Sequence, residues 1–379
     1  MTEIVGQGMS SARTRTRSWL KVFVMTFPCV AVYAFFGSLP AQALAPSGFQ
    51  SKDGNEILQG GQDWQNIAPA RWQTNQPDIF NSSKDDVFIS RANSDNSNPR
   101  IGKAVIPYGS SDLSALRVAS ETIDNQSFLY LAWDRIKALD SANMNFEFNL
   151  NRTLRPRSST PVRSAGDLLI TFDFTRGASH VDLGVARWGS GSCQASNNIS
   201  GCWSQVVDLD NSGFANGSVS GDRLFGEASV NLTAAGIYGT LGCAAFNSAT
   251  LVSRSSAAFN SEVTDFTPPA KIAMSNCAEV TINAVGAPGI ASSARTFALY
   301  NDQAPVGGSQ GIEDTPTNPT QLCAVETAAG SCKISGIKPG SYWVAEMASQ
   351  PDSEKLASQP VTVVSDSRIV LTFATTLTQ

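Results

Sequence analysis

Histidine is almost absent from this chain, which has one histidine, His180, among 379 residues. A Ser-His-Asp site would have to use His180, but the sequence has no Gly-x-Ser-x-Gly segment of the kind that presents a catalytic serine. Cys-x-x-Cys pairs are absent as well, which disfavours a zinc site. We therefore interpret His180 as a solvated loop residue.

Charge is also scarce, because Asp, Glu, Lys and Arg make up 16% of the sequence and the formal net charge is −5. Several basic residues fall near the start, so the remainder of the chain is more acidic still. Nucleic acids and anionic membrane surfaces attract basic proteins. We therefore expect neither as a partner.

Long apolar runs are missing except near the start. Residues 22–36 are apolar apart from Thr26 and Pro28, basic residues precede them, and Ala41-Gln42-Ala43 supplies small residues for cleavage. This pattern predicts a secretion signal over residues 1–43, with cleavage after Ala45 as the alternative. An uncleaved anchor is the competing interpretation, but the run is shorter than the ~20 residues that a span needs. We expect the mature protein outside the cell, with no membrane span.

Of the seven cysteines, Cys29 lies in the predicted signal and six follow it. An even number of cysteines in an exported chain predicts disulfides, although six thiols allow about 15 pairings. Each bridge would contribute about 2–4 kcal/mol. Chain order favours three local bridges: Cys193–Cys202, Cys243–Cys277 and Cys323–Cys332.

Alternating apolar residues, separated by turns rich in Gly, Asn and Ser, occur along nearly the whole mature chain, and no long stretch has a helical period. This pattern predicts an all-β protein. The mature chain exceeds the usual size of one domain. We expect a sandwich or jelly-roll domain at 44–275 and a smaller seven-stranded sandwich at 276–379. The Pro-Pro segment 265–271 is the expected break.

Two hairpins are expected in the larger domain. Residues 128–133 and 144–150 would form the first, with a turn at 140–143, and residues 168–174 and 181–185 the second. Residues 46–100 are expected to be irregular, with Trp64 and Trp72 as apolar anchors. The arginine-rich stretch 151–163 is interpreted as a solvated loop rather than an anion site.

Two acidic segments are candidates for Ca²⁺. Asp208 and Asp210 alternate ahead of Gly213, as in the opening of many Ca²⁺ loops, but Val219 stands where a bidentate Glu belongs. Asp85 and Asp86 form a second acidic loop. Against both stands the simpler interpretation of a solvated turn.

Sugar chemistry would need an opposed pair of carboxylates or an exposed aromatic ring. Core positions are the preferred interpretation of the tryptophans, with Trp188, beside residues 189–192, as the one most exposed and the candidate for stacking on a sugar. Four carboxylates in or beside expected strands are the candidates for hydrolysis: Asp134, Glu147, Asp173 and Glu227.

The C-terminal part carries seven expected strands, at 279–283, 296–300, 321–325, 332–334, 342–346, 360–364 and 369–373. Between the fourth and fifth the sequence reads Gly-Ile-Lys-Pro-Gly-Ser-Tyr-Trp-Val-Ala-Glu over residues 336–346. Pro and Gly suit a tight turn, and Tyr342, Val344 and Glu346 share a strand face. With its flanking strands, this segment resembles the prealbumin-like (Cna B-type, SpaA pilin-like) domains of Gram-positive surface proteins.

The resemblance covers residues 277–379 and implies a sandwich that serves as a spacer. Many such domains carry a Lys–Asn isopeptide bond assisted by an acid at the position of Glu346. This sequence has Asn283 where the lysine is expected and no Asn on the last strand. We therefore predict no isopeptide bond and interpret Glu346 as a hydrogen-bonded or partly exposed remnant. A Cys323–Cys332 bridge would brace the domain instead.

Segments of the larger part, including 128–135 and 226–233, resemble an uncharacterised exported domain of actinobacterial surface proteins over roughly residues 60–275. This resemblance implies no activity. The chain ends at Gln379 without the sorting signal of sortase-anchored proteins, so release, non-covalent attachment and truncation all stay open.

We expect a secreted or cell-surface structural or adhesive protein, not an enzyme, with a host or cell-wall glycan or protein as its partner. A Ca²⁺-dependent carbohydrate-binding protein is the first alternative, and a secreted hydrolase is the second. No cofactor is expected apart from Ca²⁺ in the first alternative.

Overall fold

The computed structural model describes most of the chain after residue 43. It covers residue 44 and residues 47–57, 61–94, 99–156, 159–178, 180–189, 202–210, 213–238, 243–286, 294–301, 321–326, 329–347 and 358–374. The predicted signal lies outside these residues. No described residue is in an α-helix, and strands dominate. The fold is all-β, as predicted.

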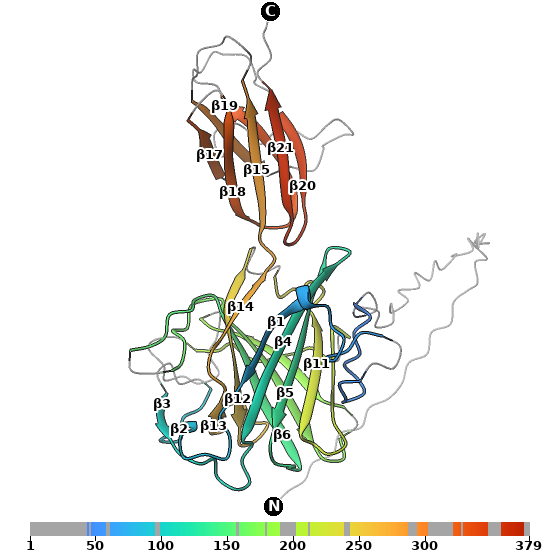
Figure 1. The fold of residues 1–379 in the computed structure, drawn as a ribbon, viewed down its shortest axis with the longest axis vertical. Coiled ribbons are helices and arrows are strands. Elements are labelled where there is room, and N and C mark those ends of the chain that lie inside the picture. Colours follow the sequence, from blue (N-terminus) through green and yellow to red (C-terminus); the bar gives the residue numbers. More distant parts are fainter. Residues whose placement is uncertain are drawn as a thin grey trace, which may run out of the picture. The chain divides into compact units, whose positions relative to one another are not determined.

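A five-stranded antiparallel sheet forms one layer of what we call the larger β unit, strands β1 to β14 (Figure 1). Asp124 and Asn125 form the two-residue turn between β4 and β5, with φ of 50° and 63°. Such turns need positive φ, which Asp and Asn tolerate. The 3-10 helix η2 (Pro69–Arg71) precedes the first strand. In sheet order, the strands are β1 (Trp72–Pro77), β4 (Leu113–Ile123), β5 (Gln126–Arg135), β11 (Phe225–Asn231) and β10 (Ala215–Val219).

A nine-stranded sheet forms the second layer of the larger β unit. The predicted hairpin at 168–174 and 181–185 is confirmed, because β7 and β8 pair antiparallel. In sheet order, eight strands are β3 (Arg100–Lys103), β2 (Asp86–Ile89), β13 (Val263–Phe266), β12 (Ala245–Arg254), β6 (Ser141–Asn149), β7 (Leu168–Thr175), β8 (Asp182–Arg187) and β9 (Val207–Asp208). The ninth, β14 (Ala270–Ser275), pairs with β12.

The main core lies between these two sheets and takes alternate residues from each strand. β5 contributes Leu129, Leu131 and Trp133 to it. The intervening residues of β5 are buried on the outer face of the five-stranded sheet, where Phe49 and Trp64 cover them. The segment around residues 49–67 therefore closes the second side of β5, which explains why the whole run 128–133 is apolar.

The predicted hairpin of residues 128–133 with 144–150 is wrong. β5 pairs with β4 and β11, whereas β6 pairs with β7 and β12. The chain therefore crosses from one sheet to the other between Arg135 and Ser141. Alternation does not separate the two cases, because strands of facing sheets present their apolar sides to the same core.

The Pro-Pro segment does not separate two domains. Pro268 and Pro269 lie between β13 and β14, and both of these strands pair with β12. The prolines occupy a connection, where a missing N–H costs no ladder hydrogen bond. The last strand of the larger β unit ends at Ser275, and the next begins at Ala278.

The prediction for residues 46–100 is partly wrong. This stretch contains β1, an edge strand of the five-stranded sheet, and β2, which lies between β3 and β13 in the nine-stranded sheet. Trp64 is an apolar anchor as expected, since it is buried, and Trp72 is half-buried against it.

Strands β15 to β21, which we call the C-terminal sandwich, form two smaller sheets around one core. All seven predicted strands are present at their predicted places. One sheet is β18 (Gly330–Ile337), β15 (Ala278–Val285) and β21 (Arg368–Ala374), in which β15 and β21 are parallel. The other is β17 (Gln321–Val325), β16 (Arg295–Asn301), β19 (Gly340–Met347) and β20 (Ser358–Val363).

Candidate functional site

Four aspartates from four separate segments lie close together in the larger β unit. Asp78 follows β1, Asp85 precedes β2, Asp112 precedes β4, and Asp265 belongs to β13. Carboxylate oxygens of Asp78, Asp85 and Asp265 lie within 4.8 Å of one another, and Asp112 interacts electrostatically with the first two. We call these four residues the aspartate cluster. It connects the ends of two strands of each sheet.

Backbone hydrogen bonds fix the segments that carry the aspartate cluster. The N–H of Asp78 donates to Ser114 O at 2.9 Å, and the N–H of Ala104 donates to Asp85 O at 3.1 Å. The N–H of Ile136 donates to Asp112 O at 3.0 Å. The carboxylates therefore project from anchored backbone.

Some oxygens of the aspartate cluster accept backbone hydrogen bonds. Those of Asp265 accept from Leu113 N at 2.7 Å and from Phe266 N at 2.8 Å. Four others are buried and have no hydrogen-bond partner: Oδ2 of Asp78, Oδ1 and Oδ2 of Asp85, and Oδ1 of Asp112. Asp85, Asp112 and Asp265 each have 0% of their surface exposed. A polar atom buried in this way costs free energy unless something binds it.

Positive charge near the aspartate cluster is limited. Lys137 Nζ lies 3.8 Å from Asp112 Oδ2. Burial, with the repulsion of neighbouring aspartates added, raises the pKa of Asp78 to about 8 and that of Asp265 to about 9. Burial and the charge of Asp112 raise the pKa of Asp85 to about 6, although the nearby backbone N–H of Asp86 opposes the rise.

The structure separates the two residues of the acidic loop that the sequence singles out. Asp85 lies in the aspartate cluster, whereas Asp86 forms an ion pair of 2.8 Å with Lys103 on the next strand. Nothing in the sequence indicates Asp78, Asp112 or Asp265 as neighbours of Asp85, because the fold alone brings these distant positions together.

The other predicted Ca²⁺ segment, with Asp208 and Asp210, begins at the end of β9 and leads toward β10. The N–H of Asp210 donates to Asp208 Oδ1 at 2.8 Å, and Asp210 Oδ2 accepts from the N–H of Leu183. Burial, then Asp208 and Asp182, raise the pKa of Asp210 to about 6. Residues 211 and 212 lie outside the described residues, so the Ca²⁺ loop stays a prediction there. His180 is an exposed loop residue, as predicted, with Nε2 2.9 Å from Asp182 Oδ1.

The arginine-rich stretch is not simply a solvated loop. Arg163 Nε and Nη2 donate to the two carboxylate oxygens of Glu147 at 2.9 and 2.7 Å. Its guanidinium lies 4.8 Å from the ring centre of Trp188 and 5.0 Å from that of Trp203. Trp188 is 4% exposed. Trp188 is therefore a core residue, as the preferred interpretation had it, and not the exposed ring of the alternative, because Arg163 and Trp203 cover it.

The four candidate carboxylates for hydrolysis are each held by partners of their own. Glu147 pairs with Arg163, as described above. Asp134 lies 3.0 Å from Arg117 Nη2, and Asp173 accepts two hydrogen bonds from Arg254 at 2.6 and 2.7 Å. Such pairs are typical of structural acids.

Glu227 differs from these three because no cation holds it. Its oxygens accept from Gly54 N at 3.0 Å and from Trp64 Nε1 at 3.1 Å. Burial and the neighbouring Asp63 raise the pKa of Glu227 to about 9. The side chain thus fastens the segment that covers the outer face of the five-stranded sheet.

Two of the three expected disulfides lie in the described residues. Cys323 of β17 is bonded to Cys332 of β18. Cys243 is bonded to Cys277, with their Cα atoms 4.9 Å apart. Cys193 of the third pair lies outside the described residues.

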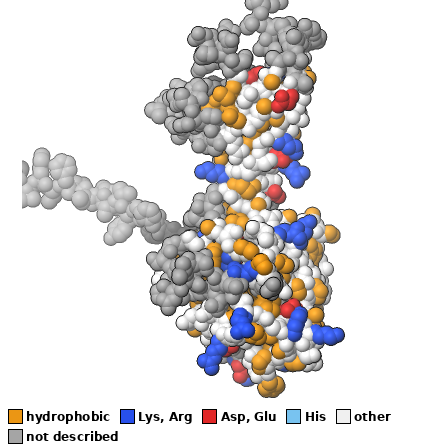
Figure 2. Space-filling model, turned by 90° about the vertical axis from the view of Figure 1, so that its left-hand side faces the viewer, with side chains coloured by type: hydrophobic (Ala, Val, Ile, Leu, Met, Phe, Trp, Pro, Cys, Tyr) orange, Lys and Arg blue, Asp and Glu red, His pale blue; other side chains and the backbone are white. Residues whose placement is uncertain are grey.

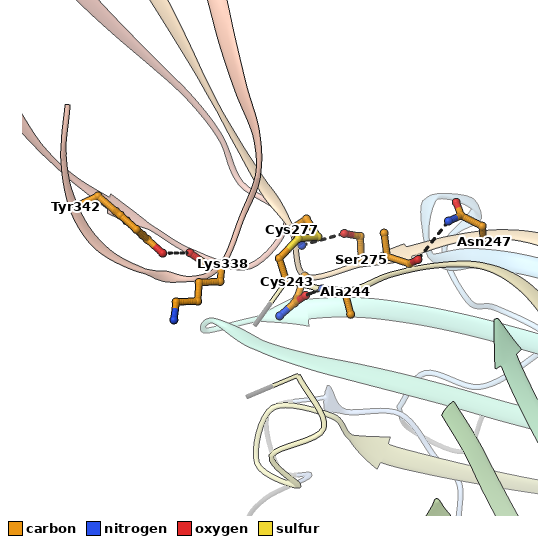
Figure 3. The surroundings of a disulfide bond; sticks show 9 residues. Cys243, Ala244, Asn247, Ser275, Cys277, Lys338 and Tyr342 are labelled. Atoms are coloured by element: carbon orange, nitrogen blue, oxygen red, sulfur yellow. Dashed lines mark hydrogen bonds between the residues drawn. A yellow bond between two sulfur atoms is a disulfide. The ribbon is translucent and has the colours of Figure 1, made fainter. Parts of the chain in front are cut away.

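The Cys243–Cys277 bridge lies where β14 leads into β15 (Figure 3). Hydrogen bonds strengthen the same place: Ala244 N donates to Asn276 Oδ1 at 2.8 Å, and Asn276 N donates to Ala244 O at 3.2 Å. Cys277 N donates to Ser275 Oγ at 2.8 Å. The disulfide and these hydrogen bonds therefore fix the short connection between β14 and β15.

Glu346 is hydrogen-bonded, as expected. Its oxygens accept from Arg295 Nε at 2.6 Å and Nη2 at 2.7 Å. Arg295 Nη1 also donates to the carbonyls of Val285 and Phe373, at 3.4 and 3.3 Å. Arg295 of β16 therefore pairs with Glu346, the acid at the position that the resemblance connects with an isopeptide bond.

No family model matches this chain, and no curated protein matches it. Three solved structures show weak similarity. "The Bacillus anthracis TIE protein" is 9% identical, with 67% of this chain and 55% of that chain covered and a TM-score of 0.19. "Trapped Toxin" is 8% identical over 66% and 56%, with a TM-score of 0.15. The human-specific toxin intermedilysin is 9% identical over 66% and 58%, with a TM-score of 0.14.

Similarity at this level carries no argument about fold or function. This chain spans little more than half the length of each of these proteins.

None of the described residues belongs to a helix with the length and apolarity that a membrane span requires. On the face drawn in Figure 2, Lys and Arg side chains lie at several separate places among uncharged ones.

Proposed function

We propose that this chain is an exported, non-catalytic surface protein with a structural or adhesive role. In this proposal the C-terminal sandwich is a spacer and the larger β unit presents the binding surface. The observation that carries the proposal is the Cys243–Cys277 bridge. Disulfides persist in oxidising compartments, and this one reinforces the connection through which a spacer would pull.

The bridge changes the path of tension. Without it, a pull on β15 would pass through Cys277 to β14, which pairs in the sheet with β12. With it, tension passes directly from Cys277 to Cys243, two residues before β12. β12 also pairs with β6 and β13. Tension therefore reaches the middle of the nine-stranded sheet and bypasses β14.

Single-molecule pulling from the two ends of the chain tests this path. The bridge closes a sequence separation of 34 residues, which cannot extend while the disulfide is intact. We expect the variant C243S/C277S to lengthen by about 110–120 Å more than the oxidised wild type on complete unfolding. The control C323S/C332S frees a separation of only 9 residues, or about 30 Å. Equal lengths for C243S/C277S and wild type would contradict the proposed path.

The loops beside the aspartate cluster are the proposed binding surface. Ile79 and Phe80 are 51% and 48% exposed, and Val105 and Tyr108 are 50% and 99% exposed. The two loops are joined by the hydrogen bond from Ala104 N to Asp85 O. Single exposed apolar residues are common, but four on two joined loops are typical of an interaction site. The proposed ligand is a glycan or protein of the host or cell wall.

Cell fractionation and binding test the function itself. We expect the full chain, expressed in a Gram-positive bacterium, to leave the cytoplasm with residues 1–43 removed. On isolated walls or host cells, the variant F80S/Y108S should bind at least about tenfold more weakly than wild type. V370S, which changes a 61% exposed valine of β21, is the control and should bind normally. Retention in the cytoplasm with the leader attached would overturn the proposal.

A further inference from the structure

We propose that the aspartate cluster is a Ca²⁺ site that ties the two sheets of the larger β unit together. The inference goes beyond the structural or adhesive role and does not depend on it. It starts from Asp85, which is fully buried and has two carboxylate oxygens without a hydrogen-bond partner.

The chemistry of the cluster selects a hard cation. Asp85 points one oxygen at oxygens of Asp78 and Asp265, all within 4.8 Å. Asp78 Oδ2 and Asp112 Oδ1 are buried and unpartnered as well. Carboxylate oxygens are ligands of Ca²⁺ and Mg²⁺, whereas zinc and copper favour nitrogen and sulfur. An acceptor without a donor is satisfied by a cation and needs no further protein group.

Coordination geometry favours Ca²⁺ over Mg²⁺. Ca²⁺ binds oxygen at about 2.3–2.6 Å, so two oxygens on one ion lie up to about 4.6–5.2 Å apart. Mg²⁺ binds at about 2.0–2.1 Å, which limits the separation to about 4.0–4.2 Å. The three oxygens lie within 4.8 Å of one another, which is compatible with ligands of one Ca²⁺. Ca²⁺ also accepts irregular geometry, as ligands from four separate segments require.

Charge balance supports the same assignment. Of the four carboxylates, Asp112 alone forms an ion pair among the described residues, with Lys137 Nζ at 3.8 Å. Lys103, the cation next to Asp85 in the pairing of β2 with β3, is bound to Asp86 at 2.8 Å. Mutual repulsion of buried carboxylates is costly, and a divalent cation removes it. The competing arrangement is a cluster of carboxyl groups that share protons.

The position of the site gives the cation a structural consequence. Asp78 and Asp112 adjoin β1 and β4 of the five-stranded sheet, while Asp85 and Asp265 belong to β2 and β13 of the other. Neither described disulfide lies in these segments. Ca²⁺ would therefore supply the cross-link between the layers at this end of the sandwich.

Calorimetry and thermal unfolding of the full mature chain test the site. After treatment with EDTA, we expect heat of binding on adding CaCl₂ and a rise in Tm of roughly 5–10 °C at 100 times Kd. MgCl₂ should bind at least about tenfold more weakly. D85N should lose both responses, yet in EDTA it should be at least as stable as wild type, because it removes repulsion.

The matched control is D86N, which changes the adjacent acid outside the cluster and should keep the full Ca²⁺ response. D112N provides a second test within the cluster if D85N fails to fold. An absence of Ca²⁺ binding to the wild type would overturn the proposal and support shared protons. A D85N protein that still responds to Ca²⁺ would overturn it as well, and equal affinity for Mg²⁺ would overturn the choice of Ca²⁺.

Discussion

Glu346 in the C-terminal sandwich and Asp85 in the larger β unit are both carboxylates held inside a β-sandwich, but their surroundings differ. Glu346 has a guanidinium of its own, with Arg295 Nε and Nη2 at 2.6 and 2.7 Å. Asp85 has three other aspartates as neighbours and no hydrogen-bond partner for its oxygens. An acid closed by an arginine has no room for another ligand. An acid without such a partner still has its coordination sites free.

The larger β unit also pairs buried acids with arginines, as at Glu147 and Asp173. Burial alone would raise the pKa of Glu147, but Arg163 and the hydrogen bond from Asn149 hold it below its usual value. Burial prevails at Asp78 and Asp265, whose pKa values are raised to about 8 and about 9. Glu147 therefore keeps its charge, whereas the clustered acids need a proton or a cation.

Removal of the arginine in the C-terminal sandwich should have the largest effect on stability. We expect R295M to lower the free energy of unfolding of this sandwich by about 3–5 kcal/mol, because it leaves Glu346 as an unpaired, mostly buried charge. Differential scanning calorimetry of the full chain would measure the change. The double variant R295M/E346M should recover most of the loss. A small effect of R295M alone would show that water already reaches Glu346.

The disulfide of the same sandwich should come next. Cys323 and Cys332 close a loop with a sequence separation of 9, for which chain entropy predicts about 2–3 kcal/mol. We expect C323S/C332S to lower the free energy of unfolding of the sandwich by this amount, whereas C243S/C277S, with a separation of 34, should cost about 1 kcal/mol more. Calorimetry under oxidising conditions would compare them. The opposite order would indicate that loop length does not set the effect.

The two regions also differ in how much of them the sequence predicted. All seven strands of the C-terminal sandwich were predicted, because each is short, alternates and ends at a Gly, Pro or Ser turn. In the larger β unit β5, β6, β7 and β8 were predicted, but β4 and β12 were not, and residues 128–133 and 144–150 were paired wrongly. In a strand such as β5, which is buried on both faces, the residue pattern does not indicate which strand it pairs with.

The candidate site was predictable only in part. Asp85 was singled out because Asp86 follows it, yet Asp86 pairs with Lys103 on the surface side. Asp265 was read as part of a linker, although β13 places it next to Asp85. Trp188 was named as the most exposed of the tryptophans because glycines follow it, although a core position was preferred, and Arg163, from a stretch taken for a loop, covers it. Contacts between distant segments determine the surroundings of Asp85, Asp265 and Trp188, and the spacing of residues along the chain does not reveal these contacts.

Glu227 should show a pH effect that Glu147, paired with Arg163, lacks. Its pKa of about 9 in the folded protein exceeds the ~4.3 of an unfolded chain. The folded state therefore binds the extra proton, and the stability is fully present below pH ~4.3 and lost as pH rises toward 9. At pH 9 we expect the free energy of unfolding of E227Q to exceed that of wild type by at least about 1 kcal/mol.

Urea unfolding of wild type and E227Q at several pH values between 5 and 9 measures the difference. Asp78 and Asp265 titrate in the same range, so only the gap between the two proteins reports Glu227. The control E147Q should differ from wild type by a constant free energy of unfolding over this pH range, because Arg163 keeps Glu147 charged. A constant gap between wild type and E227Q would show that Glu227 is already ionised when folded.

The smallest effect is expected at Asp86, directly beside the aspartate cluster in the sequence. Its partner Lys103 is 56% exposed and 2.8 Å away, and exposed pairs of this kind contribute about 0–1 kcal/mol. We expect D86N to change the free energy of unfolding by less than about 0.5 kcal/mol and to keep the Ca²⁺-dependent rise in Tm. The comparison with D85N then isolates what burial adds to one carboxylate, since the two residues are adjacent and the substitution is the same. If D86N instead abolished the Ca²⁺ response, the cation would belong to the surface loop and not to the buried oxygens between the sheets.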